Sequence, residues 1–115
     1  MGPREIIEKW VEAFNRANAD ELAAFYHDEA LNHQMPNEPV IGKNAIREMF
    51  RQEFSMAEMT CIPVQILEDG DWAALEWKDP NGMRGCGFFQ VVKDKIMVQR
   101  GYWDKASMLR LSTNK

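Results

Sequence analysis

Glu76 and Lys78 are the charged residues of this sequence whose spacing best suits chemistry. They lie two residues apart in the segment 72–78, which we predict to be a β-strand, so both side chains project from one face of a sheet. In a poorly solvated site, a carboxylate and an ammonium group couple and titrate as a pair. Glu76 is therefore a candidate proton acceptor, and Lys78 is its electrostatic partner. The alternative interpretation is an ion pair without a chemical role.

Asn32 and Gln34 are uncharged polar residues with the same spacing, in a short strand predicted over residues 30–35. Their amide groups could orient a water molecule or a carbonyl group of a substrate. Tyr26, which we place on a short helix, could add a hydroxyl group to the same site. The alternative for Tyr26 is a core ring with a solvated hydroxyl group.

The sequence predicts no metal ion and no other cofactor. His27 and His33 share no predicted face, and Cys61 and Cys86 lack the spacing of metal ligands. There is no glycine-rich phosphate loop and no dinucleotide-binding motif.

The length of 115 residues suits one domain, which we expect to cover residues 1–115. Apolar residues make up 45% of the chain and charged residues 28%, as in ordinary globular proteins. The net charge is −4 and the 14 Lys and Arg residues are scattered, which argues against a nucleic-acid partner. No apolar run approaches the roughly 18 residues of a membrane-spanning helix. The first residues do not resemble a secretion signal, so we expect a cytoplasmic protein.

The apolar spacing predicts helices in the first half of the chain and strands in the second, which indicates an α+β fold. The helices are expected over residues 3–17, after a cap at Asn18, and after Gly42. The strands are expected over residues 60–68, 72–78, 83–92 and 95–104. Short turns between them, one of them over residues 79–82, predict an antiparallel meander. Pro63 places the first of these strands at the edge of the sheet.

Several segments, in their order along the chain, resemble the nuclear transport factor 2-like superfamily and in particular its SnoaL-like (polyketide cyclase) branch. The segments are residues 10–15, 25–30, 34–36 with 40–46, 87–91, 95–96 and 100–104. A weaker resemblance connects the chain to limonene epoxide hydrolase. The resemblance implies three N-terminal helices packed in a curved antiparallel sheet, a cone-shaped α+β barrel with a pocket inside.

The resemblance also implies which side chains line that pocket. It places Glu76 and Lys78 where the epoxide hydrolase branch has two charged residues that point into the cone. The same register places further residues inside, namely Asn32, Gln34, Trp72, Ala74, Met83, Gly85, Gly87, Phe89, Gln99, Gly101 and Trp103. The glycines would leave room for a ligand, and the apolar side chains would suit a small apolar molecule. A bulge or strong coiling of the sheet is the alternative reason for Gly85 and Gly87.

The implied hydrolase mechanism needs an Asp–Arg–Asp arrangement, which this chain lacks. Glu76 stands at the Arg position, Lys78 at one Asp position and Gly101 at the other. Gly101 has no side chain that could act as an acid, so epoxide hydrolysis by that mechanism is not expected. Three hypotheses remain open: an acid/base isomerase, cyclase or hydrolase, a non-catalytic small-molecule binding protein, and a structural homodimer with a filled pocket.

The outer face of the sheet is expected to carry an apolar patch. By the same register, the patch consists of Leu75, Trp77, Cys86, Phe88, Val98 and Tyr102. A patch with exposed aromatic residues is unusual on a monomer, and relatives pair through this face. We therefore expect a two-fold homodimer, with Arg84 and Arg100 in or around the contact.

Overall fold

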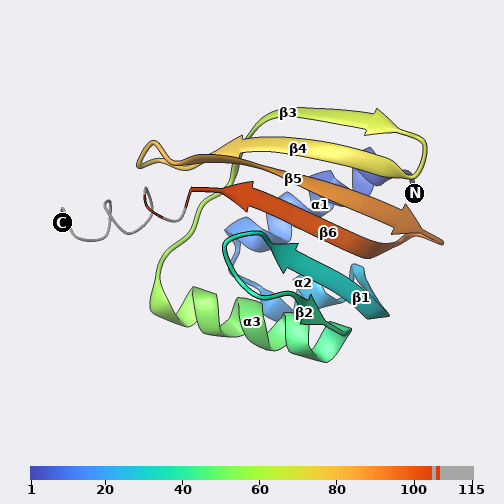
Figure 1. Ribbon diagram of the computed structural model, residues 1–115, viewed down its shortest axis with the longest axis horizontal. Coiled ribbons are helices and arrows are strands. Elements are labelled where there is room, and N and C mark those ends of the chain that lie inside the picture. Colours follow the sequence, from blue (N-terminus) through green and yellow to red (C-terminus); the bar gives the residue numbers. More distant parts are fainter. Residues whose placement is uncertain (105, 107–115) are drawn as a thin grey trace.

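Six strands form one open, curved sheet, and the helices lie on one of its faces (Figure 1). The computed structural model describes residues 1–104 and 106. In chain order, the elements are α1 (Pro3–Asn15), α2 (Ala19–Ala23), β1 (Tyr26–Gln34), β2 (Val40–Ile41), α3 (Lys43–Met56), β3 (Ile62–Asp69), β4 (Trp72–Lys78), β5 (Arg84–Val92) and β6 (Lys95–Trp103). The strand order is β2-β1-β6-β5-β4-β3. The expected α+β fold is therefore confirmed.

The start of each of the first two helices follows from local sequence. Pro3 occupies the first turn of α1, where its missing N–H group costs no hydrogen bond. Asn18 caps α2, because its side-chain oxygen accepts a hydrogen bond from the Glu21 backbone N–H at 3.0 Å. The Glu21 carboxylate in turn accepts from the Asn18 amide at 3.2 Å. The predicted cap at Asn18 is confirmed.

Tyr26 differs from its prediction, because it begins β1 and does not belong to α2. The strand also starts four residues earlier than the predicted Ala30. The reason is tertiary: Tyr26 pairs in parallel with Ile96 of β6, and the Ile96 N–H group donates to the carbonyl oxygen of Phe25 at 2.7 Å. Pairing with a strand 70 residues away could not be read from local periodicity.

The predicted meander is confirmed, since β3, β4, β5 and β6 pair successively in antiparallel fashion. Pro63 lies on β3, which forms one edge of the sheet as expected. The turn after β4, however, has five residues and not four. The Asp79 carboxylate accepts hydrogen bonds from the backbone N–H groups of Asn81 and Met83, at 2.9 and 2.8 Å. Lys78 therefore pairs with Arg84, and β4 is shifted by one residue relative to the predicted register.

The core lies between the helices and the inner face of the sheet, by which we mean the face that the helices cover. Trp10 of α1 stands at its centre, with ring centroids 5.4 Å from Phe89 of β5 and 6.3 Å from Phe50 of α3. The opposite, outer face has no covering element among the described residues, and Phe88 and Tyr102 are exposed there. In the described part of the chain, no helix combines the length and the apolar character needed to cross a membrane.

Candidate functional site

The shifted register places Glu76 and Lys78 on the outer face, so their predicted direction is wrong. On β4, Ala73 and Leu75 are buried, and Trp77 packs against the core. Because successive strand residues alternate between faces, the remaining β4 positions point outward. Those positions are Trp72, Ala74, Glu76 and Lys78, and the expectation that they line an inner pocket is wrong.

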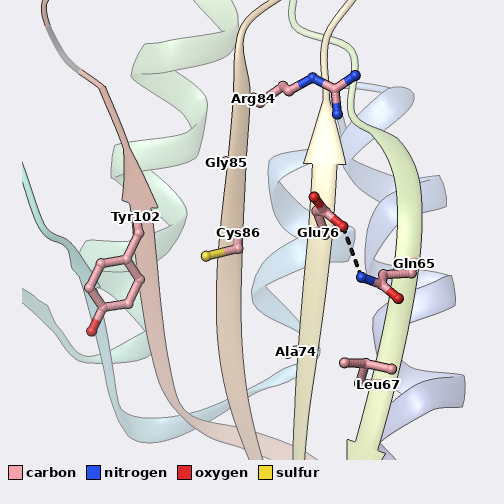
Figure 2. Close-up of a pocket in the computed structure, with 8 residues that line it drawn as sticks. All are labelled: Gln65, Leu67, Ala74, Glu76, Arg84, Gly85, Cys86 and Tyr102. Carbon is pink, nitrogen blue, oxygen red and sulfur yellow. Dashed lines mark hydrogen bonds between the residues drawn. The ribbon is translucent and has the colours of Figure 1, made fainter.

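Glu76 lines an open hollow of about 500 Å³ on the outer face (Figure 2). Its carboxylate accepts a hydrogen bond from the Gln65 side-chain amide at 2.9 Å. The other lining residues are Leu67, Ala74, Arg84, Gly85, Cys86 and Tyr102. Lys78 is exposed and forms no ion pair with any described residue. The coupled Glu76–Lys78 pair inside a pocket is therefore not a feature of this fold.

Trp72 and Met83 also depart from their predicted places. Trp72 lies on the outer face, where the Arg100 guanidinium group sits 4.8 Å from the centroid of its ring. Met83 lies in the five-residue turn before β5 and not on the strand. Neither residue forms a wall of an inner pocket.

The inner face carries the other predicted positions, which come together through direct strand pairing. Gln34 pairs with Gly101, which pairs with Gly87. Asn32 pairs with Gln99, and Gly85 pairs with Trp103. Directly paired residues point to the same face of a sheet. The strands β1, β5 and β6 therefore present these side chains together, toward the helices.

The deep part of this face holds a chain of hydrogen bonds among uncharged groups. The Trp10 indole N–H donates to the Tyr26 hydroxyl oxygen at 3.0 Å. The Tyr26 hydroxyl donates to the side-chain oxygen of Gln99, which also accepts from the Asn32 amide at 3.0 Å. Tyr26, Asn32 and Gln99 are all buried. Burial raises the pKa of Tyr26 above its usual value, so its phenol stays protonated and donates.

The chain continues toward the surface through Gln34 and Trp103. The Gln34 amide donates to the Asn32 side-chain oxygen at 2.7 Å. The Trp103 indole N–H donates to the Gln34 side-chain oxygen at 2.9 Å. Gln34 and Trp103 are half-buried, so they form the outer end of this series of hydrogen bonds. We call the six residues the inner network: Trp10, Tyr26, Gln99, Asn32, Gln34 and Trp103.

The sequence predicts space for a ligand beside Gly85, Gly87 and Gly101, but side chains of the protein itself occupy that space. A Cβ atom on Gly101 would lie 2.0 Å from the Gln34 side-chain oxygen, so the Gln34 amide fills that position. A Cβ atom on Gly85 would lie 2.4 Å from the Trp77 ring. At Gly87 the nearest atom belongs to Phe89, at 3.2 Å. These glycines therefore admit close packing of neighbouring side chains.

Glu53 is a half-buried carboxylate of α3 that sequence reasoning missed. It continues the inward stripe of α3 that begins with Ile46 and Phe50. Burial raises the pKa of the Glu53 carboxyl, and the charge of Glu53 in turn raises the pKa of Tyr26. The signal was present in the sequence as an acidic residue at an apolar position of the helical pattern.

The family to which the chain belongs follows from its sequence. The family model of the SnoaL-like domain matches residues 7–99. The chain belongs to the SnoaL-like domain family. This confirms the resemblance seen in the sequence. A search of curated proteins finds no match to this chain.

Solved structures resemble this SnoaL-like domain over nearly its whole length. A protein from Catenulispora acidiphila with a ketosteroid isomerase-like fold has a TM-score of 0.85 and 14% identity, covering 98% of this chain and 95% of its own. A polyketide cyclase, described as putative, from Xanthomonas campestris has a TM-score of 0.84 and 18% identity, covering 95% of both chains. An epoxide hydrolase from M. tuberculosis resembling limonene epoxide hydrolase has a TM-score of 0.83 and 18% identity, covering 96% and 88%. At these identities, the likeness establishes the fold and not the activity.

Proposed function

We propose that this SnoaL-like domain binds a small molecule at the inner network, and that Gln99 recognises an oxygen atom of that molecule. The observation that carries the proposal is the hydrogen-bonding state of Gln99. Its side-chain oxygen accepts two hydrogen bonds, while its two N–H donors have no partner among the described residues. An amide with unused donors in a largely apolar interior suits a carbonyl, ether or hydroxyl oxygen.

The polar groups of the network are uncharged, which favours binding over acid/base turnover by the residues first considered. The inner positions of β4 are Ala73, Leu75 and Trp77, so this strand directs no acid or base inward. Gly101 supplies none from β6. Gln34 keeps its place in the proposal as an orienting group, because it links Asn32 to Trp103. The similar structures include a polyketide cyclase, described as putative, and an epoxide hydrolase. Both names indicate small molecules that contain oxygen.

The test uses two tryptophan indole N–H groups as reporters. Nitrogen-15-labelled protein is titrated with a panel of small cyclic ketones, lactones and alcohols while the indole signals of Trp10 and Trp103 are followed. We expect saturable shifts of both signals, and about tenfold weaker binding in Gln99→Leu, because a ligand oxygen loses its donor. Gln52→Leu, at an exposed position of α3, should bind as the wild type does. A panel that leaves both indole signals unmoved would contradict the proposal.

A second candidate is a structural homodimer, which a different observation favours. The side chains of Gln34, Trp77 and Phe89 fill the space beside the inner glycines. On the outer face, Phe88 and Tyr102 are 37% and 41% exposed, with their ring centroids 5.9 Å apart. The predicted patch must be corrected, because Leu75 and Trp77 point inward. We propose an outer patch of Leu67, Cys86, Phe88, Val98 and Tyr102 as the contact between two copies.

A further inference from the structure

The hollow on the outer face combines one acidic and one basic side chain that do not pair with each other. Glu76 and Arg84 both line it, and in Figure 2 the Arg84 side chain extends from β5 across the end of β4. No ion pair joins the two, and none joins either of them to another described residue. The Glu76 carboxylate accepts a hydrogen bond only from the neutral Gln65 amide. One concave surface therefore presents an unpaired positive and an unpaired negative charge.

Arg84 stands apart from the other arginines in the described part of the chain. Each of those contacts a carboxylate, a carbonyl oxygen or an aromatic ring, namely Arg4, Arg16, Arg47, Arg51 and Arg100. Arg84 is exposed, and its guanidinium group has no such contact with a described residue. A guanidinium group presents its donors in a planar fork that fits a carboxylate. Arg84 is thus suited to bind a carboxylate of another molecule.

A second copy of the chain is the partner that these two charges fit. In a two-fold contact, each residue of one copy meets a fixed residue of the other, and the same pairing occurs twice. A surface with one acid and one base can therefore complement itself, whereas a partner of a single charge sign would be repelled by one of the two. The hollow also shares Leu67, Cys86 and Tyr102 with the outer patch proposed above as the contact between two copies.

We propose that Glu76 of each copy pairs with Arg84 of the other, so that two symmetric ion pairs fix the orientation of the copies. This inference rests on the homodimer proposed above and does not depend on the inner network. Exposed Phe88 and Tyr102 supply the apolar part of the contact. The ion pairs supply its specificity, because a differently oriented contact would bury the charges unpaired or place like charges together.

The test reverses one charge at a time and measures association by sedimentation equilibrium. In Glu76→Arg, two arginines of opposite copies face each other at both pairs, and in Arg84→Glu two glutamates do. We expect each variant to weaken dimerisation about a hundredfold, because like charges repel across an interface. Lys78→Glu is the matched control, since Lys78 is exposed on the same face but does not line the hollow. It should dimerise as the wild type does.

Mixing the two single variants tests whether the pair joins different copies. One variant carries arginine at both positions and the other carries glutamate at both, so a mixed dimer contains two attractive pairs. We expect mixing to restore dimers that neither variant forms alone, which an ion pair within one copy could not do. The wild type has a net charge of −4 and each substitution changes it by two units, so both variants stay negative and overall charge does not favour their association. The double variant Glu76→Arg with Arg84→Glu should fold and dimerise as the wild type does.

The inference is overturned if either single variant dimerises as tightly as the wild type, or if the mixture or the double variant stays monomeric. Tyr102→Asp tests the homodimer separately. If that substitution separates the copies while the charge reversals do not, the outer contact stands and the ion pairs are refuted. A wild-type protein that sediments as a monomer at micromolar concentration refutes both.

Discussion

Position 101 is a glycine, and the absence of a side chain there allows Gln34 to lie where it does. Gln34 lies directly over Gly101, and from there its amide bridges Asn32 and Trp103. In the hydrolase resemblance, this position holds an acid. Here an amide from the neighbouring strand occupies the space that such an acid would need. The absence of an acid at position 101 and the place of Gln34 in the inner network therefore have one cause, since the glycine leaves room for the Gln34 amide.

Gly101→Ala should destabilise the fold, because the new methyl group would collide with the Gln34 amide. We expect the free energy of unfolding in urea to fall by about 1–3 kcal/mol, as for other overpacked sites. The double variant Gly101→Ala with Gln34→Ala should recover most of this loss, because the colliding amide is gone. A Gly101→Ala protein as stable as the wild type, with an unshifted Trp103 indole signal, would show that Gln34 does not depend on this glycine.

Glu53 should make stability depend on pH in a definite direction. Burial raises the pKa of its carboxyl above the value in the unfolded chain, so the folded state favours the protonated form. The contribution of this group to stability is thus fully present below the unfolded pKa and is lost as the pH rises through the folded one. Glu53→Gln should therefore raise the melting temperature at neutral pH, and the gain should shrink toward about pH 4. A lower melting temperature of Glu53→Gln at neutral pH would mean that the charge has a stabilising partner.

At the scale of the elements, one carboxylate stabilises the five-residue turn that accompanies the observed facing of β4. Asp79 binds two backbone N–H groups and extends the turn to five residues. A four-residue turn over residues 79–82 would pair Lys78 with Met83 and turn Glu76 inward. The observed pairing of Lys78 with Arg84 turns Leu75 and Trp77 inward instead. The length of this turn and the facing direction of β4 are therefore linked.

Asp79→Ala should weaken this turn without changing any inner side chain. The variant loses two hydrogen bonds to the backbone, and we expect about 1–2 kcal/mol less stability in urea unfolding. Asp69→Ala, at the end of β3, is the control, because its carboxylate makes no hydrogen bond with a described residue. Equal stabilities of the two variants would indicate that the Asp79 contacts do not hold the turn.

The positions of the helices and strands could be predicted from the sequence more fully than the directions in which their side chains point. The helical spacing, the Asn18 cap and the edge position of Pro63 are local signals, and the structure agrees with them. The alternation on β4 also carried the correct direction, since Leu75 and Trp77 are apolar whereas Glu76 and Lys78 are charged. Charged side chains are costly to bury, so that pattern should outweigh a resemblance. The inner network could not be predicted as a whole, because its hydrogen bonds join residues that lie far apart in the sequence.

At the scale of the whole molecule, the two faces of the sheet have different requirements. The inner face is covered by helices and lined by aromatic and amide side chains. The outer face combines exposed Phe88 and Tyr102 with polar groups, including Glu76, Arg84 and Arg100. Protein–protein interfaces likewise combine apolar residues with polar groups. The SnoaL-like fold determines this division into faces, whereas the side chains on each face determine what that face can contact.

The outer patch should hold two copies together, and one charge at its centre should separate them. Tyr102→Asp places a carboxylate beside Phe88, where a two-fold contact would bury it twice, so we expect sedimentation equilibrium to change from dimer to monomer. Ile41→Asp is the control, because Ile41 is 68% exposed on β2 at the far edge of the sheet. It should leave the dimer intact. Trp77→Asp, by contrast, should unfold the protein, because Trp77 packs against the core. A wild-type protein that sediments as a monomer at micromolar concentration would contradict the proposed contact, since an apolar patch of this kind would then stand free in water.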